Sequence, residues 1–156
     1  MDHQKVGAKI VRLRRYGRVH VQTCARARAL AVEVQIRQLF ADISGPVDGT
    51  LEHLMRGLRP VAPDAARAIL TFLLYRDMAY DVEIMPEQDA AALAEELFAG
   101  FAPDVSCLTN AAWDRDRRHG ELCLSNWQPY TAATFDAGVV LHDAHSVAVV
   151  WFEDED

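Results

Sequence analysis

This chain of 156 residues is 51% hydrophobic and 25% charged, which is the composition of a folded globular protein. The composition excludes collagens, coiled-coil rods, low-complexity tails and small disulfide scaffolds. The net charge of −7 is uneven: residues 1–40 hold nine Lys and Arg against two acidic residues, a net of +7, which leaves −14 for the rest. We expect one α+β domain over residues 1–156, with a basic helical head (about 1–43) and an acidic body (about 44–156). Such asymmetry indicates charged partners, or one part of the chain covering the other.

Before Pro103 the periodicity is mainly helical. Val6, Ile10 and Leu13 recur at helical spacing, and Gly17 is placed to end this first helix. Residues 18–24 alternate like a strand, which leaves a short strand or the lead-in to the next helix as alternatives. Apolar stripes predict four further helices, at about 25–43, 50–58, 64–79 and 87–100.

After Pro103 the apolar pattern changes to alternation, which indicates strands. Residues 146–152 are apolar on both faces, so we expect this strand at the centre of a sheet. Asp143-Ala144-His145 precedes it as a hairpin turn. The predicted strands are about 104–109, 121–125, 137–142 and 146–152. The order of elements predicts an α+β fold, in which N-terminal helices pack on a C-terminal antiparallel sheet with a terminal hairpin.

The cysteines and the hydropathy predict the compartment in which the protein is located. Cys24, Cys107 and Cys123 are odd in number and form no CxxC pair, so we expect free thiols in a reducing compartment. No apolar run reaches the roughly 18–20 residues that span a bilayer. The charged start, MDHQKVGAKIVRLRR, lacks the apolar core of a signal peptide. These features predict a cytoplasmic protein without a membrane partner.

No motif indicates catalysis. The sequence contains neither a GxSxG elbow nor the GxGxxG and GxxxxGK[ST] phosphate loops. His142 and His145 flank a predicted turn and have no further ligands at zinc spacing, so we expect no metal and no cofactor. The chain is therefore predicted to be non-enzymatic. A small metal-dependent hydrolase that uses Asp and His residues of the C-terminal half stays open as an alternative.

The N-terminal run GAKIVRLRRYG resembles the first helix of helix-turn-helix regulators of the Cro/repressor class. That resemblance implies a recognition helix directly afterwards. The residues that follow, RVHVQTCARARAL, have neither its pattern nor its turn, and the net charge of −7 opposes binding to phosphates. We expect no direct contact with nucleic acid, and a DNA-binding regulator remains a second alternative.

The C-terminal thirty residues resemble the ends of bacterial immunity proteins that protect cells against contact-dependent and polymorphic toxins. The residues that carry the resemblance are Trp127, Pro129, Thr134, Phe135, Asp136 and the acidic run Glu153 to Asp156. The resemblance implies a non-enzymatic protein that neutralises a cognate toxin domain by direct binding. An acidic protein can cover the basic active site of a nuclease-type toxin and gain rapid, electrostatically steered association. The oligomeric state stays open.

Among the candidate contact patches, the C-terminal run ranks first, because it continues directly from a predicted central strand. Buried aromatic residues near an acidic patch would supply the anchoring energy. The residues expected to contact the toxin are Glu153, Glu155, Asp154 and Asp156 of that run, Asp143 of the turn, Glu87, Glu95 and Glu96 of a helix face without basic residues, and Trp127. Trp113 and Tyr130 are further aromatic candidates, and Trp151 is expected in the core instead.

Overall fold

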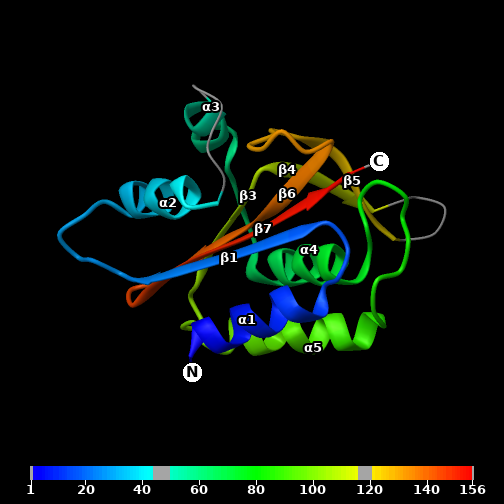
Figure 1. Ribbon diagram of the computed structural model, residues 1–156. Coiled ribbons are helices and arrows are strands. Elements are labelled where there is room, and N and C mark those ends of the chain that lie inside the picture. The colour runs from blue at the N-terminus through cyan, green and yellow to red at the C-terminus, as the bar shows by residue number, and fades with distance from the viewer. Residues whose placement is uncertain (1, 44–49, 116–120, 156) are drawn as a thin grey trace.

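Helices cover both faces of an antiparallel sheet in the computed structural model, which describes residues 2–43, 50–115 and 121–155 (Figure 1). The helices are α1 (His3–Leu13), α2 (Val32–Ala41), α3 (Thr50–Gly57), α4 (Pro63–Tyr75) and α5 (Glu87–Phe98). The strands are β1 (Arg18–Ala25), β2 (Arg59–Val61), β3 (Ser106–Thr109), β4 (Ala111–Arg115), β5 (Leu122–Trp127), β6 (Phe135–His142) and β7 (Ser146–Asp154). The α+β class predicted from the sequence is confirmed.

The main sheet has five strands in the order β1-β7-β6-β3-β2, and β4 and β5 form a separate hairpin. Strand β7 pairs with β1 along one side and with β6 along the other, from Ser146 to Asp154. Its residues from Val147 to Phe152 are fully buried, which confirms the central, doubly covered strand. The β6–β7 turn also lies where it was predicted, because the carboxylate of Asp143 accepts hydrogen bonds from the backbone N–H of His145 and Ser146.

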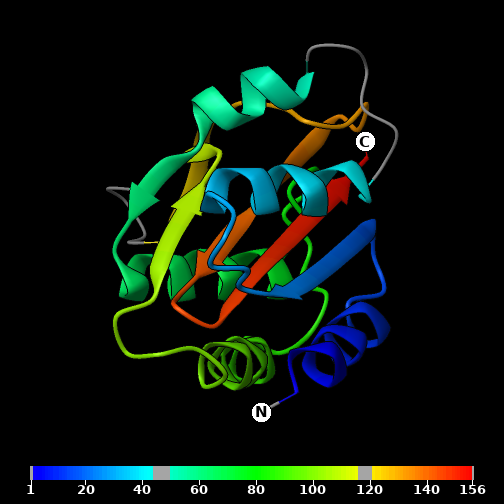
Figure 2. The ribbon, with the colours of Figure 1, turned by 90° about the vertical axis from the view of Figure 1, so that its left-hand side faces the viewer.

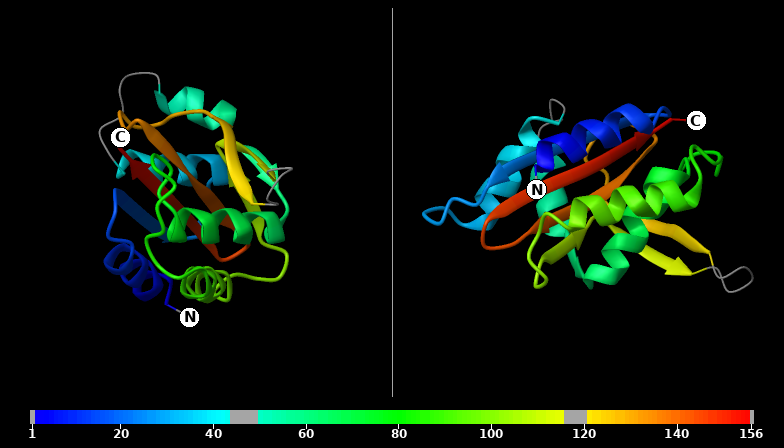
Figure 3. Two further views of the ribbon diagram at one scale, coloured as in Figure 1. Left: turned by 90° about the vertical axis from the view of Figure 1, so that its right-hand side faces the viewer. Right: turned by 90° about the horizontal axis from the view of Figure 1, so that it is seen from below.

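Two hydrophobic clusters hold the layers together. On one face of the sheet, α1, α4 and α5 pack over Val139, Val150 and Phe152; the view from below shows α1 and α5 side by side beneath the strands (Figure 3). On the other face, α2 and α3 cover Val149 and Trp151. Because helices bury both faces of the same strands, the sheet forms the core of the molecule.

The second cluster is built around three rings. Phe40 of α2 meets Tyr130 and Trp151 edge to face, with ring centroids 5.1 and 5.0 Å away. The hydroxyl of Tyr130 donates a 2.7 Å hydrogen bond to the carbonyl of Phe40. Tyr130 and Trp151 are at most 1% exposed, so they contribute to folding and are not available as surface anchors.

The predicted helix at 25–43 is wrong at its start. The alternating residues 18–24 form β1, which pairs with β7 up to Ala25, and α2 begins only at Val32. The apolar stripe correctly located residues of α2, but the pairing of β1 with a strand far along the chain overrode local helix propensity before it. The alternative that the sequence left open is thus resolved as a strand.

Two further differences concern the end of α4 and two short strands. The helix predicted to run to residue 79 ends at Tyr75, because Arg76 is extended and the chain turns at Asp77. Strands β2 and β4 were not predicted. Strand β2 has only three residues and contains Pro60, so it carries almost no alternation of its own and exists through its pairing with β3.

A buried ion pair joins the N-terminal helix to the last strand. The guanidinium of Arg14, directly after α1, donates to both carboxylate oxygens of Asp154, at 2.8 and 2.7 Å. The two side chains are 0% and 1% exposed. Arg14 also donates to the carbonyl of Leu73 at 2.7 Å, and Asp154 accepts from the backbone N–H of Met78 at 2.9 Å. The pair therefore connects α1, α4, β7 and the chain after α4.

The chain passes this ion pair at Gly17, whose φ is +61°. A Cβ placed on Gly17 would lie 2.2 Å from the Asp154 carboxylate and from the Glu153 carbonyl. The position therefore requires glycine for both backbone conformation and space. Gly17 does not end α1, as the sequence suggested, but lies in the link from α1 to β1.

The ion pair generates a stability prediction. Arg14→Met leaves the carboxylate of Asp154 buried without its counterion and should lower the free energy of unfolding by about 3–5 kcal/mol. The double variant Arg14→Met/Asp154→Leu removes both charges and should lose less than the sum of the two single variants, by about 2 kcal/mol or more. Denaturant unfolding of the four proteins measures this coupling, with the exposed Arg12→Met as control. Additive losses would contradict it.

Asp136 is a second buried carboxylate, fully enclosed at the start of β6. Its Oδ2 accepts from the backbone N–H of Tyr130 and Thr131, at 2.8 and 2.6 Å, and from the indole of Trp151. Its Oδ1 has no hydrogen-bond partner among the described residues. Burial raises the pKa of Asp136 above its ordinary value of 3.8, and the hydrogen bonds from Thr131, Tyr130 and Trp151 only partly oppose this.

A raised pKa makes the contribution of Asp136 to stability depend on pH. The protonated carboxyl favours the folded state, so this stability is present below pH 3.8 and is lost as pH rises through the folded-state pKa. Asp136→Asn keeps an acceptor for Tyr130 and Thr131 but cannot ionise. Unfolding measured at several pH values should therefore favour the variant, relative to the wild type, more at neutral pH than in acid. A pH-independent difference, like that expected for the exposed Asp104→Asn, would contradict the prediction.

Candidate partner-binding site

The C-terminal acidic run does not form the exposed patch expected from the sequence. Asp154 is 1% exposed and paired with Arg14, and Glu153 is 6% exposed and hydrogen-bonded to the imidazole of His20 at 2.9 Å. Glu155 is exposed and accepts hydrogen bonds from Thr134. Asp156 lies outside the described residues. The expectation of exposure is wrong for Glu153 and Asp154 because β7 continues to Asp154, between β1 and β6.

The acidic face of α5 is also largely neutralised. Glu96 accepts from the ammonium of Lys9 at 2.5 Å, and Glu95 lies 3.3 Å from the guanidinium of Arg67. The helix itself holds no basic residue, as the sequence indicated, but α1 and α4 supply the cations. Glu87, at the start of α5, is exposed and has a different environment, described below.

Asp143 and Trp127 have local roles. Burial alone would raise the pKa of Asp143, but hydrogen bonds from the backbone N–H of Ala102, His145 and Ser146 outweigh it and hold the pKa below its ordinary value. The half-buried ring of Trp127 lies against Phe135, with centroids 5.3 Å apart.

The predicted contact residues do not form one surface. The β6–β7 turn and the acidic run lie at opposite ends of β7, which has nine residues. A strand of that length spans about 30 Å. A single patch that includes Asp143 and Glu153 is therefore excluded by the topology of the hairpin.

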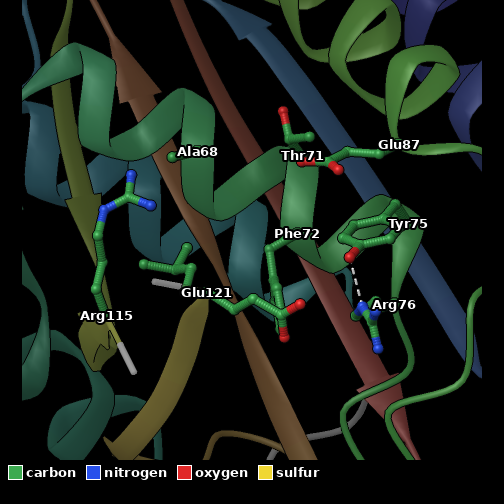
Figure 4. A pocket seen from close by; sticks show the side chains of 9 residues that line it. Ala68, Thr71, Phe72, Tyr75, Arg76, Glu87, Arg115 and Glu121 are labelled. Carbon is green, nitrogen blue, oxygen red and sulfur yellow. Dashed lines mark hydrogen bonds between the residues drawn. The ribbon is translucent and has the colours of Figure 1, made fainter. Parts of the chain in front are cut away.

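The structure instead places an acidic cleft between α4, the loop after it and the β5 edge of the small hairpin. Two adjoining hollows of about 240 and 270 Å³ share Phe72, Glu121 and Leu122. The close-up shows Glu121 between Arg115 on one side and Arg76 on the other, with Glu87 above (Figure 4). The full lining is Ala68, Thr71, Phe72, Tyr75, Arg76, Asp77, Met78, Asp81, Glu87, Arg115, Glu121, Leu122, Cys123 and Leu124.

One wall of the acidic cleft is the 76–86 loop, which connects α4 to α5 and is held by hydrogen bonds of its backbone to carboxylate and carbonyl groups. The carboxylate of the buried Asp77 accepts from the backbone N–H of Ala79 and Tyr80, at 3.3 and 2.7 Å. The backbone N–H of Asp77 donates to the carbonyl of Val82 at 3.0 Å. The hydrogen bond from Met78 to Asp154 fastens the loop to the buried ion pair. These hydrogen bonds therefore order the loop without a bound partner.

The tip of the 76–86 loop presents an unusual group of side chains. Tyr80 is 65% exposed and Val82 is 45% exposed, and Asp81 lies between them. Asp81 has a φ of +56°, the left-handed conformation that non-glycine residues rarely adopt. Strained backbone that is retained by surrounding contacts is concentrated at functional sites. An aromatic, an acidic and an aliphatic side chain are thus fixed side by side toward solvent.

The charge of the acidic cleft is negative at its rim. Asp81, Glu87, Glu121 and Arg115 are exposed, so the exposed lining holds three carboxylates and one guanidinium. Arg76 is engaged locally: its guanidinium donates to the hydroxyl of Tyr75 and contacts the Asp81 carboxylate at 2.9 Å, and the bond to Tyr75 is the main reason why its pKa is raised. Exposed carboxylates over an apolar floor of Phe72 and Leu122 suit a partner with basic and apolar side chains.

The described side chains that could bind a metal or act in catalysis do not form a cluster. Within residues 2–43, 50–115 and 121–155, no three His, Cys, Asp or Glu side chains converge to hold a metal ion. The three cysteines are unpaired, and burial raises the pKa of Cys107 to about 11, which keeps that thiol protonated. Burial lowers the pKa of His142, with Arg26 adding to the effect, so that imidazole is neutral at pH 7.

Among the described residues, no helix is long and apolar enough to cross a bilayer. Comparisons with protein-family models, with curated proteins and with solved structures find no match to this chain.

Sequence reasoning named Glu87 as a contact residue, on an acidic helix face, but missed the acidic cleft and the 76–86 loop. The predicted helix at 64–79 extended over Asp77 and Met78, which concealed the loop. The available signal was the end of the apolar stripe of α4 at Leu74, followed by Arg76-Asp77 and by residues 78–85, which have no helical apolar stripe, before Pro86. Glu121 was missed because its position depends on how β5 packs against α4.

The preorganisation of the 76–86 loop can be tested at Asp77. Asp77→Ala removes the acceptor for two backbone N–H groups and should lower the free energy of unfolding by about 1–2 kcal/mol. Amide hydrogen exchange at position 77, Ala79 and Tyr80 should become faster, while Asp77→Asn retains part of the protection. Unchanged exchange in Asp77→Ala, as expected for the exposed control Asp104→Ala, would show that the carboxylate does not order the loop.

Proposed function

We propose that this protein is a non-enzymatic, cytoplasmic binding protein, an immunity protein that neutralises a cognate basic toxin domain of the nuclease type by direct contact. Its resemblance to bacterial immunity proteins and its net charge of −7 support this function. In this proposal the contact is made by the acidic cleft and the tip of the 76–86 loop, which are exposed, and not by the C-terminal run, in which Glu153 and Asp154 are buried.

The observation that carries the proposal is the fixed, exposed tip Tyr80-Asp81-Val82 beside the acidic cleft. Interfaces draw most of their affinity from a few anchors, among which tyrosine is enriched. An anchor that is already ordered loses little conformational entropy on binding. Asp77 and the hydrogen bond from Met78 to Asp154 supply that order before any partner arrives.

The charges at the rim account for recognition of a basic partner. A nuclease must present positive charge to phosphates, so its active site attracts a protein whose exposed carboxylates are concentrated in one place. Glu87 and Glu121 meet that condition, and Asp81 adds an exposed carboxylate beside them although Arg76 contacts it. Glu95, Glu96, Glu153 and Asp154 do not, because cations of this chain or the imidazole of His20 already contact them.

The anchor is tested by binding measurements with the toxin domain encoded beside this gene. Tyr80→Ala should raise Kd by about thirtyfold, which corresponds to about 2 kcal/mol, mainly through faster dissociation. Tyr16→Ala is the matched control, because Tyr16 is also exposed (56%) but lies outside the acidic cleft. Equal effects of the two substitutions would remove the loop tip from the interface.

The charges are tested by reversing them. Glu121→Lys and Glu87→Lys should slow association, and the effect should shrink as salt is raised, because screening acts mainly on the long-range encounter. Asp104→Lys makes the same charge change at an exposed site outside the cleft. The immunity function itself is tested by co-expression: if the wild type neither binds the adjacent toxin nor protects cells from it, or if no toxin gene is adjacent, the proposed function is wrong.

A further inference from the structure

One edge of the main sheet is open. Strand β1 pairs with β7 along all eight of its residues, but no described strand pairs with its outer side. Figure 2 shows β1 at the border of the sheet with α1 beside it. The backbone groups of β1 that do not bond to β7 therefore face outward as a row of donors and acceptors, which can pair with another strand.

The two edges of the sheet differ in their protection. The opposite edge, β2, has three residues and includes Pro60, and shortness and proline both prevent further pairing. Strand β1 is long, contains no proline, and its register with β7 from Arg18 to Ala25 has no bulge. The edge at β1 thus lacks two devices by which proteins usually block strand addition.

A groove runs along this open edge. It has a volume of about 470 Å³ and lies between α1 and the middle of β1. Gly7, Ala8 and Val11 of α1 form its apolar wall, and Val21 and Thr23 of β1 form the other side. Val11 is 48% exposed. A strand added beside β1 would direct alternate side chains into this groove, because paired residues on neighbouring strands point to the same face.

The surroundings of the groove are basic. Arg12 lines it, and Arg15 and Arg18 are exposed at the end of α1 and the start of β1. None of the three forms an ion pair within the part of the chain that the structure describes. This surface therefore has the opposite charge to the acidic cleft and suits an occupant with carboxylates.

We infer that the open edge of β1 is a second docking site, which binds an extended acidic segment of a partner protein as an additional antiparallel strand. Small or β-branched side chains of that segment enter the groove against Ala8 and Val11, and its carboxylates meet Arg12, Arg15 and Arg18. This site does not depend on the proposed immunity function, because it uses another surface and another charge. Its main-chain pairing supplies affinity, and the groove and the arginines supply specificity.

The inference is tested by selecting displayed random peptides of about ten residues, the length of a long strand, on the full-length protein. We expect enriched peptides with small or β-branched residues at alternate positions, and with Asp or Glu both at the positions between them and at the end that lies near Arg12. Ala8→Trp fills the groove and should weaken the best peptide at least about tenfold, and Arg12→Glu should weaken it by a similar factor. Val34→Trp, a substitution on the half-exposed face of α2, is the control and should bind normally.

Every result of these binding and exchange measurements either supports or overturns strand addition at β1. Slower amide exchange along β1 in the complex, with loss of binding in Arg12→Glu, supports strand addition even if Ala8→Trp fails to fold. Enrichment of neutral or basic peptides, equal binding to Ala8→Trp, or no enrichment overturns the inference. An oligonucleotide that binds through Arg12 in place of any peptide overturns it in favour of nucleic acid. A dimer in light scattering that Ala8→Trp abolishes assigns the edge to a second copy of this chain and also overturns it.

Discussion

The bidentate contact between Arg14 and Asp154 is the constraint on which the arrangement of the molecule depends. Residues 140 positions apart share one buried charge pair, and the carbonyl of Leu73 and the N–H of Met78 complete its hydrogen bonding. Removing either partner leaves a buried charge, which is far more costly than any exposed pair. The requirement for glycine at position 17 follows from the same contact, because only a residue without Cβ passes the carboxylate.

The uneven charge of the chain is partly compensated by ion pairs between its basic head and its acidic body. The basic head supplies Lys9 to Glu96 and Arg14 to Asp154, and Arg37 pairs with Glu52. Of the two interpretations of the charge asymmetry, covering of one part by another therefore accounts for three of the nine cations of the head. Among the charges left exposed, carboxylates line the acidic cleft, and Arg12, Arg15 and Arg18 lie at the edge of β1. Recognition is expected from these remaining charges.

Periodicity predicted the elements whose signals are local. The apolar stripe of α4 and the doubly apolar β7 were located from the sequence because their burial repeats along the chain. The conformation of residues 18–24 could not be decided, since β1 exists through pairing with a strand more than a hundred residues away. The site was harder to predict, because the amino-acid composition does not determine which charged side chains are exposed. Glu153 and Glu87 are both acidic, and only the sheet register and the packing of α5 make one buried and the other exposed.

The sheet order β1-β7-β6 also determines when the fold can form during synthesis. Strand β1 is among the first elements to leave the ribosome, but its only described neighbour in the sheet, β7, is the last of the described elements. Until residues 146–154 emerge, Arg14 has no carboxylate partner and the 76–86 loop lacks the acceptor for Met78. Nascent chains without this strand therefore lack both the completed sheet and the hydrogen bond that fastens the loop to it. The sheet, and the attachment of the proposed contact surface to it, form late, after translation has passed residue 154.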